Sequence, residues 1–367
     1  MELERRTFLA ASSGSLAAGA LAGCLDDVAR GSDGVESGYA AFFALWDWAD
    51  TIGGDSVTFE NPVGTGEVGH GWEPEADLLA EIAKSDAFVY LDLPEFAWAQ
   101  EAAATLESDY ETVAVIDALE GLDDELLAWN HEHDSDEHDG HDHDHDHEHE
   151  EDSHDHATDE GDDAEHDHDH DDGGSHDGHD HGAVDPHAWV DPVLAQRIVT
   201  TIADGLADAD PDNEETFREN AETYTDRLAE LDDEFSTITG EAEHDVAILA
   251  GHNSYQYLEH RYDIEVHTPS GVSPQDEPSI TDISETIDRI EDHDIDTILY
   301  DRFEVTSEDE FPPLAETILA ESTATNAVPV TSGEGTLRAW QESGWGYVEQ
   351  MEELNVPAFR EALGADH

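Results

Sequence analysis

The chain has 367 residues, of which 95 are acidic and 12 are basic, and its formal net charge is −83. A duplex nucleic acid is excluded as a partner, because binding to phosphates requires a positive surface. Hydrophobic residues make up 37% of the chain, so a core can form. A surface this acidic, with Lys84 as the single lysine, is typical of a protein from a salt-loving archaeon, where high salt screens the self-repulsion.

The N-terminus predicts export and lipid anchoring. Glu4-Arg5-Arg6-Thr7-Phe8-Leu9 and the small apolar run up to Leu21 are typical of a twin-arginine signal peptide. The run ends in Leu21-Ala22-Gly23-Cys24, which resembles a lipobox, so we expect a signal peptide over 1–23 and a tether over 24–38. Lipidation of Cys24 would hold the protein at the extracellular face of the membrane. The alternative is a buried cysteine, and a single cysteine excludes an intramolecular disulfide.

Beyond the tether, short aliphatic runs alternate with segments of helical periodicity. This alternation predicts an α/β protein with parallel sheets, and a first lobe over residues 39–208. We expect helices at Pro74–Lys84, Leu194–Ala207 and Ser279–Glu291. The expected strands are Val57–Glu60, Ala87–Leu91, Thr112–Ile116, Val246–Ala250, Thr297–Tyr300 and Ala327–Val330.

A long helix is predicted between the two halves, over residues 209–240. Apolar and aromatic residues recur at helical spacing from Pro211 to Ile238, with no internal glycine or proline. At about 1.5 Å per residue such a helix is about 40 Å long. It suits a rigid strut that joins the first lobe to a second α/β lobe over 241–367. The alternative is an ordinary surface helix packed on one lobe.

Residues 131–182 interrupt the first half with a repetitive acidic segment. They consist almost entirely of His, Asp, Glu, Gly and Ser, and 16 of the 24 histidines lie there. Since nothing in this segment builds a core, we expect a disordered insertion loop.

Three of the remaining histidines lie where ligands bind in α/β proteins. His70 follows a predicted strand in a glycine-rich loop, and His252 directly follows Val246–Ala250. His187 lies in Asp185-Pro186-His187-Ala188-Trp189-Val190-Asp191-Pro192, where two prolines stiffen the backbone before a helix. Because ligands bind beyond the carboxyl ends of the strands in open sheets, His70 and His252 predict a site between the lobes.

These motifs resemble one family. Gly69-His70-Gly71-Trp72-Glu73-Pro74, the Asp185–Pro192 motif, and His252-Asn253-Ser254-Tyr255 are similar, in this order, to the three histidine segments of the metal-binding solute-binding lipoproteins that serve zinc and manganese ABC importers. The resemblance covers nearly all of residues 40–363, and an acidic histidine loop before Asp-Pro-His is typical of the zinc members.

The resemblance implies two lobes joined by one long rigid helix, with the metal in the cleft between them. It also implies that the chain is not an enzyme, that it acts as a monomer, and that its partners are a membrane permease and an ATPase. Three imidazoles and one oxygen ligand suit tetrahedral Zn²⁺. Mn²⁺ is the less favoured metal, because manganese-type relatives carry a glutamate where this chain has His252.

The fourth ligand is left open by the sequence. The family commonly supplies an aspartate from the loop after the last strand, but residues 331–336 read Thr-Ser-Gly-Glu-Gly-Thr. Glu334 is therefore the first candidate, Asp301 at the end of a predicted strand is the second, and a water molecule is the third.

Two other classes of protein remain as alternatives. A secreted zinc hydrolase also uses three histidines and a water, although no His-Glu-x-x-His or Gly-x-Ser-x-Gly sequence occurs. A metal-buffering adhesin would need no transporter. Two interpretations of the insertion are also open. It collects zinc for the cleft, or it is a passive acidic segment.

Overall fold

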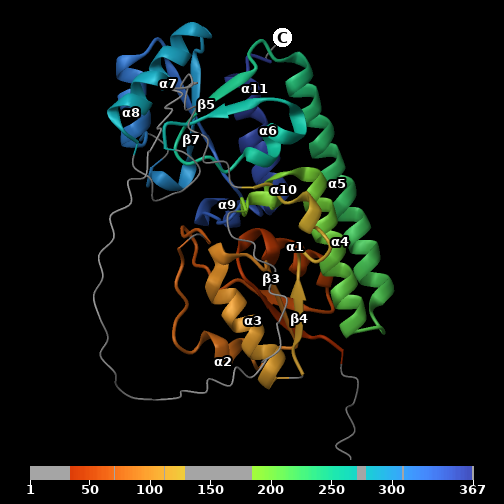
Figure 1. Cartoon of the computed structure of the whole chain (residues 1–367). Coiled ribbons are helices and arrows are strands. Elements are labelled where there is room, and N and C mark those ends of the chain that lie inside the picture. The colour runs from red at the N-terminus through yellow and green to blue at the C-terminus, as the bar shows by residue number, and fades with distance from the viewer. Residues whose placement is uncertain are drawn as a thin grey trace, which may run out of the picture.

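The computed structural model describes residues 34–69, 71–110, 112–128, 184–270, 278–307 and 310–365. Within these residues the chain folds as two α/β lobes with parallel sheets, which confirms the predicted fold class (Figure 1). The predicted signal peptide, Cys24 and the predicted insertion lie outside the described residues, and so does His70.

The first lobe is built on a parallel sheet with the strand order β2-β1-β3-β4. Its strands are β1 (Ser37–Ala40), β2 (Thr58–Glu60), β3 (Ala87–Tyr90) and β4 (Ala114–Asp117). Its helices are α1 (Phe43–Gly53), α2 (Leu78–Ile82), α3 (Ala97–Asp109) and α4 (Pro192–Ala209).

The strand β1 was not predicted, although it lies at the centre of this sheet. It begins at Ser37, inside the segment for which the sequence predicts a tether. Its sequence, Ser-Gly-Tyr-Ala, lacks the aliphatic run of the other strands. A Cβ on Gly38 would lie 2.3 Å from the ring of Phe59, so the packing of this strand requires a glycine where a strand pattern calls for a side chain.

The second lobe repeats this plan with the strand order β6-β5-β7-β8. Its strands are β5 (Val246–Ala250), β6 (Glu265–His267), β7 (Thr297–Asp301) and β8 (Asn326–Val330). Its helices are α6 (Gln256–Tyr262), α7 (Ile280–Asp292), α8 (Pro313–Glu321), α9 (Arg338–Ser343), α10 (Tyr347–Gln350) and α11 (Val356–Ala362). A single π-helical turn, Met351–Asn355, connects the last two helices.

The six predicted strands are present with ends shifted by two residues at most, and β6 was missed. The helix predicted from Pro74 is shorter than expected, since only Leu78–Ile82 is α-helical. In contrast, the predicted start at Ser279 is confirmed. Its side chain accepts a hydrogen bond from the Asp282 amide, and the Asp282 carboxylate accepts one from the Ser279 amide.

A single long helix, α5 (Glu214–Glu241), runs along both lobes on one side of the molecule (Figure 1). Its 28 residues make it about 42 Å long. The Tyr224 hydroxyl donates to Asp47 of α1 at 2.7 Å, and the Phe235 ring packs against Phe359 of α11 at 5.8 Å between ring centroids. The buried stripe of this helix therefore meets the first lobe near one end and the second lobe near the other. Its buried residues are Phe217, Ala221, Tyr224, Leu228, Leu231, Phe235 and Ile238.

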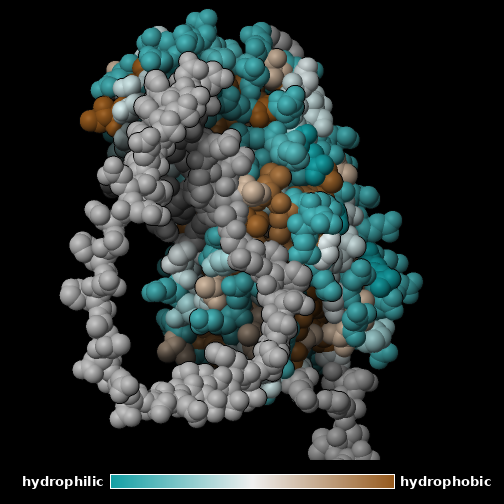
Figure 2. Space-filling view, in the orientation of Figure 1, coloured by the Kyte–Doolittle hydropathy of each residue, from teal (hydrophilic) through white to brown (hydrophobic). Residues whose placement is uncertain are grey.

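The visible surface is hydrophilic over most of its area, with a few hydrophobic groups between the two lobes and at the margin of the second (Figure 2). In the part of the chain that the structure describes, no helix is both long enough and apolar enough to cross a bilayer.

Candidate functional site

The segment around His187 folds as a 3₁₀ turn, His187–Val190, which we name the His187 turn. It lies between Pro186 and Pro192, and the second proline begins α4 at the position where a missing N–H costs nothing. The Asp185 carboxylate accepts a hydrogen bond from the His187 amide at 2.9 Å, so the carboxylate helps to form the turn. His187 is only 1% exposed, which places its ring inside the molecule.

The ring of His187 is oriented by a carboxylate on each side. Asp185 Oδ1 lies 2.7 Å from Nδ1, and Glu334 Oε1 lies 3.6 Å from Nε2. In the neutral ring, a carboxylate partner selects the tautomer with its proton on Nδ1, which leaves the lone pair of Nε2 on the side of Glu334. Burial lowers the pKa of His187, but Asp185 and Glu334 outweigh it and raise the pKa from 6.5 to about 9.

His252 comes from the opposite lobe. It follows β5 directly, in the segment Gly251–Tyr255, which we name the His252 segment. Its ring centroid lies 5.9 Å from that of His187. Its ring is less buried than that of His187, and Ser254 Oγ lies 2.8 Å from Nε2. The structure thus brings two of the three predicted histidines together from segments 65 residues apart.

Glu334 lies in the loop after β8, Thr331–Thr336, which we name the Glu334 loop. It is 2% exposed, and Ser332 Oγ donates to its carboxylate at 3.3 Å. The loop is tied to the first lobe, because Trp189 Nε1 of the His187 turn donates to the Ser332 carbonyl at 2.8 Å. In addition, a Cβ on Gly335 would lie 2.3 Å from the Glu67 carbonyl oxygen, so only glycine permits the two backbones to approach.

Asp301 lies at the end of β7 and accepts a hydrogen bond from the Phe303 amide at 2.8 Å. Burial and, to a smaller extent, the neighbouring charge of Glu334 raise the pKa of Asp301 to about 6, although the hydrogen bond from Phe303 lowers it. Burial and the charge of Asp301 also raise the pKa of Glu304 to about 7. These carboxylates are thus on the same side of the second lobe as Glu334, and their charges repel one another.

His70, the third predicted histidine, lies outside the described residues. Gly69 is described, and a Cβ there would meet the Phe96 and Phe42 side chains at 3.1 and 3.2 Å. Phe42 stacks on Phe96 at 4.9 Å and packs against Trp189 at 4.8 Å. The chain that leads to His70 therefore packs on the aromatic residues next to the His187 turn.

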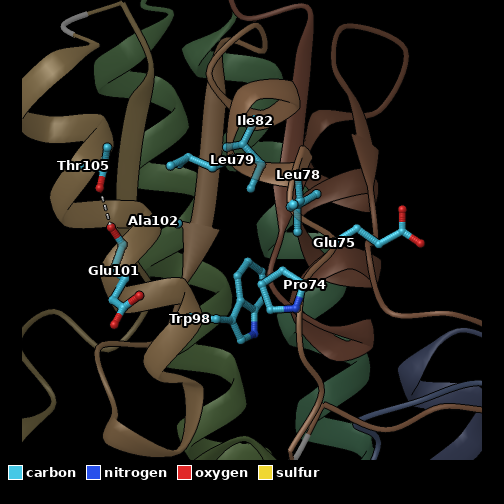
Figure 3. A pocket seen from close by; sticks show the side chains of 10 residues that line it. Pro74, Glu75, Leu78, Leu79, Ile82, Trp98, Glu101, Ala102 and Thr105 are labelled. Carbon is cyan, nitrogen blue, oxygen red and sulfur yellow. Dashed lines mark hydrogen bonds between the residues drawn. The ribbon is translucent and has the colours of Figure 1, made fainter.

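Within the described residues, no three His, Cys, Asp or Glu side chains form a group arranged to hold a metal ion. A groove of the first lobe is a separate feature. It encloses about 260 Å³ between α2 and α3, is lined by Leu78, Leu79, Ile82 and Trp98, and has the carboxylates of Glu75 and Glu101 on opposite sides (Figure 3). It offers no set of converging metal ligands.

Sequence reasoning missed the residues that hold the site from outside. Tyr257 and Arg261 of α6 bond the residues on either side of the His187 turn, and Tyr347 Oη donates to the Trp189 carbonyl at 2.6 Å. Only the composition could have pointed to one of these residues, Arg261. In a chain with 12 basic and 95 acidic residues, an arginine next to a ligand segment is notable.

A comparison with known families finds one match, to the family described as zinc-uptake complex component A, periplasmic (ZnuA), over residues 39–362. Among curated proteins, the chain is similar to the high-affinity zinc uptake system protein ZnuA of Bacillus subtilis. The two are 27% identical over 326 residues, which cover 88% of this chain and 86% of that protein.

The chain is also similar to the zinc-binding lipoprotein AdcA of Streptococcus pneumoniae. They are 26% identical over 330 residues, which cover 90% of this chain but only 56% of AdcA. The chain thus spans about half the length of that relative.

Solved structures share the fold. The Zn(II)-bound ZnuA-like domain of Streptococcus pneumoniae AdcA has a TM-score of 0.63 at 23% identity, over 90% of this chain and 99% of that domain. The metal-dependent lipoprotein YcdH from Bacillus subtilis has a TM-score of 0.65 at 23% identity, over 89% of this chain and 99% of that one.

Proposed function

The chain belongs to the zinc-uptake complex component A family, and we propose that it captures zinc between its lobes at His187, His252 and Glu334. Like its relatives, it is the zinc-binding, solute-binding component of an ABC zinc importer, and it is not an enzyme. The alternative of a secreted zinc hydrolase is therefore set aside. Zinc is the cargo, and the chain binds it and passes it on.

The observation that carries the ligand assignment is the spacing of the candidate ligand atoms. Two ligands at about 2.1 Å from a tetrahedral zinc lie about 3.4 Å apart, and the centroids of two bound imidazoles lie about 5 Å apart. Glu334 Oε1 lies 3.6 Å from His187 Nε2, and the two histidine rings lie 5.9 Å apart. The first separation is longer than an ordinary hydrogen bond of about 2.9 Å, but it suits two atoms that share a metal.

His70 completes the proposed set as the third imidazole. Support comes from the motif in which it occurs and from the packing of Gly69 on Phe42 and Phe96. Glu334 is preferred over Asp301 as the oxygen ligand, because Glu334 reaches the imidazole of His187, whereas the carboxylate of Asp301 accepts a bond from its own turn.

Imidazole-rich coordination favours zinc over manganese. Zn²⁺ is a borderline ion that accepts nitrogen ligands in a tetrahedral arrangement, while Mn²⁺ prefers carboxylate and water oxygens. We therefore propose Zn²⁺ as the cargo and Mn²⁺ as a weaker competitor.

The remaining proposals concern the parts of the chain outside the described residues. The twin-arginine sequence and Cys24 support export and lipid anchoring at the extracellular face of the membrane, next to the permease and its ATPase. The charge of −83 supports a haloarchaeal source. The domain limits proposed from the sequence, with a strut at 209–240, remain our assignment, as does action as a monomer.

The histidine-rich insertion is proposed to collect zinc for the cleft. Its many imidazoles and carboxylates raise the local concentration of metal. Its composition predicts disorder, and ordering ligands costs conformational entropy, so we expect each of its sites to be weaker than the cleft. Deleting residues 131–182 should remove the weak sites from a zinc titration and leave the tight one. Weak sites that persist after the deletion would contradict this role.

The test of the cleft is metal analysis of purified protein in high salt, with and without the substitution His187→Ala. We expect one tightly held zinc per wild-type chain that resists a mild chelator, and its loss in the variant. A tight zinc that is retained by His187→Ala would overturn the assignment.

A further inference from the structure

Helix α6 connects the two histidines. It begins directly after the His252 segment in the second lobe, and it faces the part of the first lobe that contains the His187 turn. Three of its side chains reach across: Gln256 Nε2 donates to the Ala128 carbonyl at 2.9 Å, Tyr257 bonds the backbone before the turn, and Arg261 bonds the residue after it. The same helix therefore positions both candidate ligand segments.

Tyr257 holds the first end of the turn. Its side chain is 2% exposed, and its hydroxyl donates to the Asp185 carbonyl at 2.8 Å while it accepts from the Leu127 amide at 3.1 Å. Burial raises the pKa of Tyr257, so the hydroxyl keeps its proton and remains a donor. The carboxylate of the same Asp185 holds Nδ1 of His187, so the position of this backbone sets the direction of the imidazole.

Arg261 holds the other end. Its Nε and Nη2 donate to Asp191 Oδ2 at 2.9 and 2.6 Å, and Nε also lies 3.1 Å from Oδ1. Asp191 is 2% exposed, and its Oδ1 accepts from the Val193 amide at 2.8 Å at the start of α4. A charged two-point contact of this kind fixes direction as well as distance.

We propose that Tyr257 is a positioning residue for zinc capture, which with Arg261 fixes His187 in register with His252 across the two lobes. This inference rests on the proposed function. A metal ion gains most affinity from ligands that are already placed, because ordering them on binding costs free energy. Without the hydroxyl, the Asp185 backbone is held less firmly and the imidazole above it loses its fixed direction.

The chain offers a matched control on the same helix. Tyr262 Oη donates to Asp232 Oδ1 of α5 at 2.9 Å, so Tyr262→Phe also removes one hydroxyl and one hydrogen bond. This contact does not involve the His187 turn. A comparison of Tyr257→Phe with Tyr262→Phe separates positioning of the site from a general loss of stability.

The experiment uses the full chain in high salt and measures the tightest zinc equivalent by competition with a chelator. The sites of the insertion are common to all variants, so the difference between variants reports on the cleft. We expect Tyr257→Phe to weaken zinc binding by about 3- to 10-fold, in line with one lost hydrogen bond, and Tyr262→Phe to leave it unchanged. The visible spectrum of the Co²⁺-loaded protein should change only in Tyr257→Phe, since it reports ligand geometry. Arg261→Lys should weaken zinc binding as Tyr257→Phe does, because lysine keeps the positive charge but cannot donate from two nitrogens to Asp191.

Equal zinc affinities and equal Co²⁺ spectra for Tyr257→Phe and the wild type would overturn the inference. So would losses in both tyrosine variants that follow their losses in melting temperature. The proposed function is tested separately in the same series, because its failure would appear as a wild type without a tight zinc or as a His187→Ala variant that keeps it.

Discussion

The His187 turn and the His252 segment each present one imidazole to the same space, but they are held differently. The His187 turn is buried, carries carboxylates on both sides of its ring, and is bonded to the second lobe at both ends. The His252 ring is more exposed than the His187 ring, and Ser254 Oγ, two residues away, lies 2.8 Å from its Nε2. The His187 turn is thus bonded to both lobes, while the Ser254 partner of the His252 ring comes from its own segment. We therefore expect His187 to contribute more than His252 to the affinity for zinc.

The largest loss of zinc affinity is expected on replacing the two histidines, and the loss should differ between them. His187→Ala should weaken the tight zinc site by at least about 100-fold, since replacing even an outer partner of a ligand costs about 10- to 100-fold. His252→Ala should cost less, because a water molecule can take the place of the more exposed ring. Chelator competition on both variants makes the comparison, and a larger loss in His252→Ala would reverse it.

Asp185→Asn should come next, with a loss of about 10- to 100-fold at high pH, because the amide no longer fixes the ring as a carboxylate does. Its pH dependence gives the sharper test. In the wild type the pKa of His187 is about 9, so below that pH zinc must displace a proton and binds more weakly as the pH falls. Removing the charge of Asp185 lowers this pKa, so the gap between variant and wild type should narrow from pH 9.5 to pH 7. A gap that is constant with pH would show that Asp185 does not control the proton.

Glu334→Gln should weaken binding by about 10-fold, because an amide oxygen is a poorer zinc ligand than a carboxylate. Asp301→Asn is the matched control, since it also removes one buried negative charge on the same side of the second lobe. A titration of both variants should rank Glu334→Gln as the weaker binder. The reverse ranking would assign the oxygen ligand to Asp301.

The smallest effect is expected for Ser254→Ala, about 2- to 5-fold, which is the size of one neutral hydrogen bond. It tests whether the His252 ring depends on its local partner. An effect as large as that of Asp185→Asn would mean that the two segments are equally fixed, and the comparison above would fail.

Local signals in the sequence were enough for much of the fold. The aliphatic runs of β5 and β7 and the Ser279 start of α7 carry their structure in a few consecutive residues. The central strand β1 was missed because its packing calls for Gly38, which weakens the local pattern. Glu334 was predicted from its place in the loop after the last strand, and it lies next to His187. The roles of both residues as ligands stay predictions.

What the sequence did not reveal is long-range support of the site. Arg261 and Asp191 are 70 residues apart, and Tyr257 and Asp185 are 72 apart. Neither pair has a spacing that predicts contact, because their proximity arises only when the two lobes are assembled. Candidate ligands such as His252 and Glu334 follow strands and can be predicted, whereas the residues that support them depend on the packing of whole helices.

The buried stripe of α5 has a consequence for folding. Apolar residues of both lobes belong to one continuous core, in which Leu228 and Leu231 occupy the middle of the helix. Because both lobes pack on this one unbroken helix, we expect them to melt in one cooperative transition instead of two. Since the candidate ligands come from both lobes, a chain cut within α5 should yield no half that retains tight zinc binding.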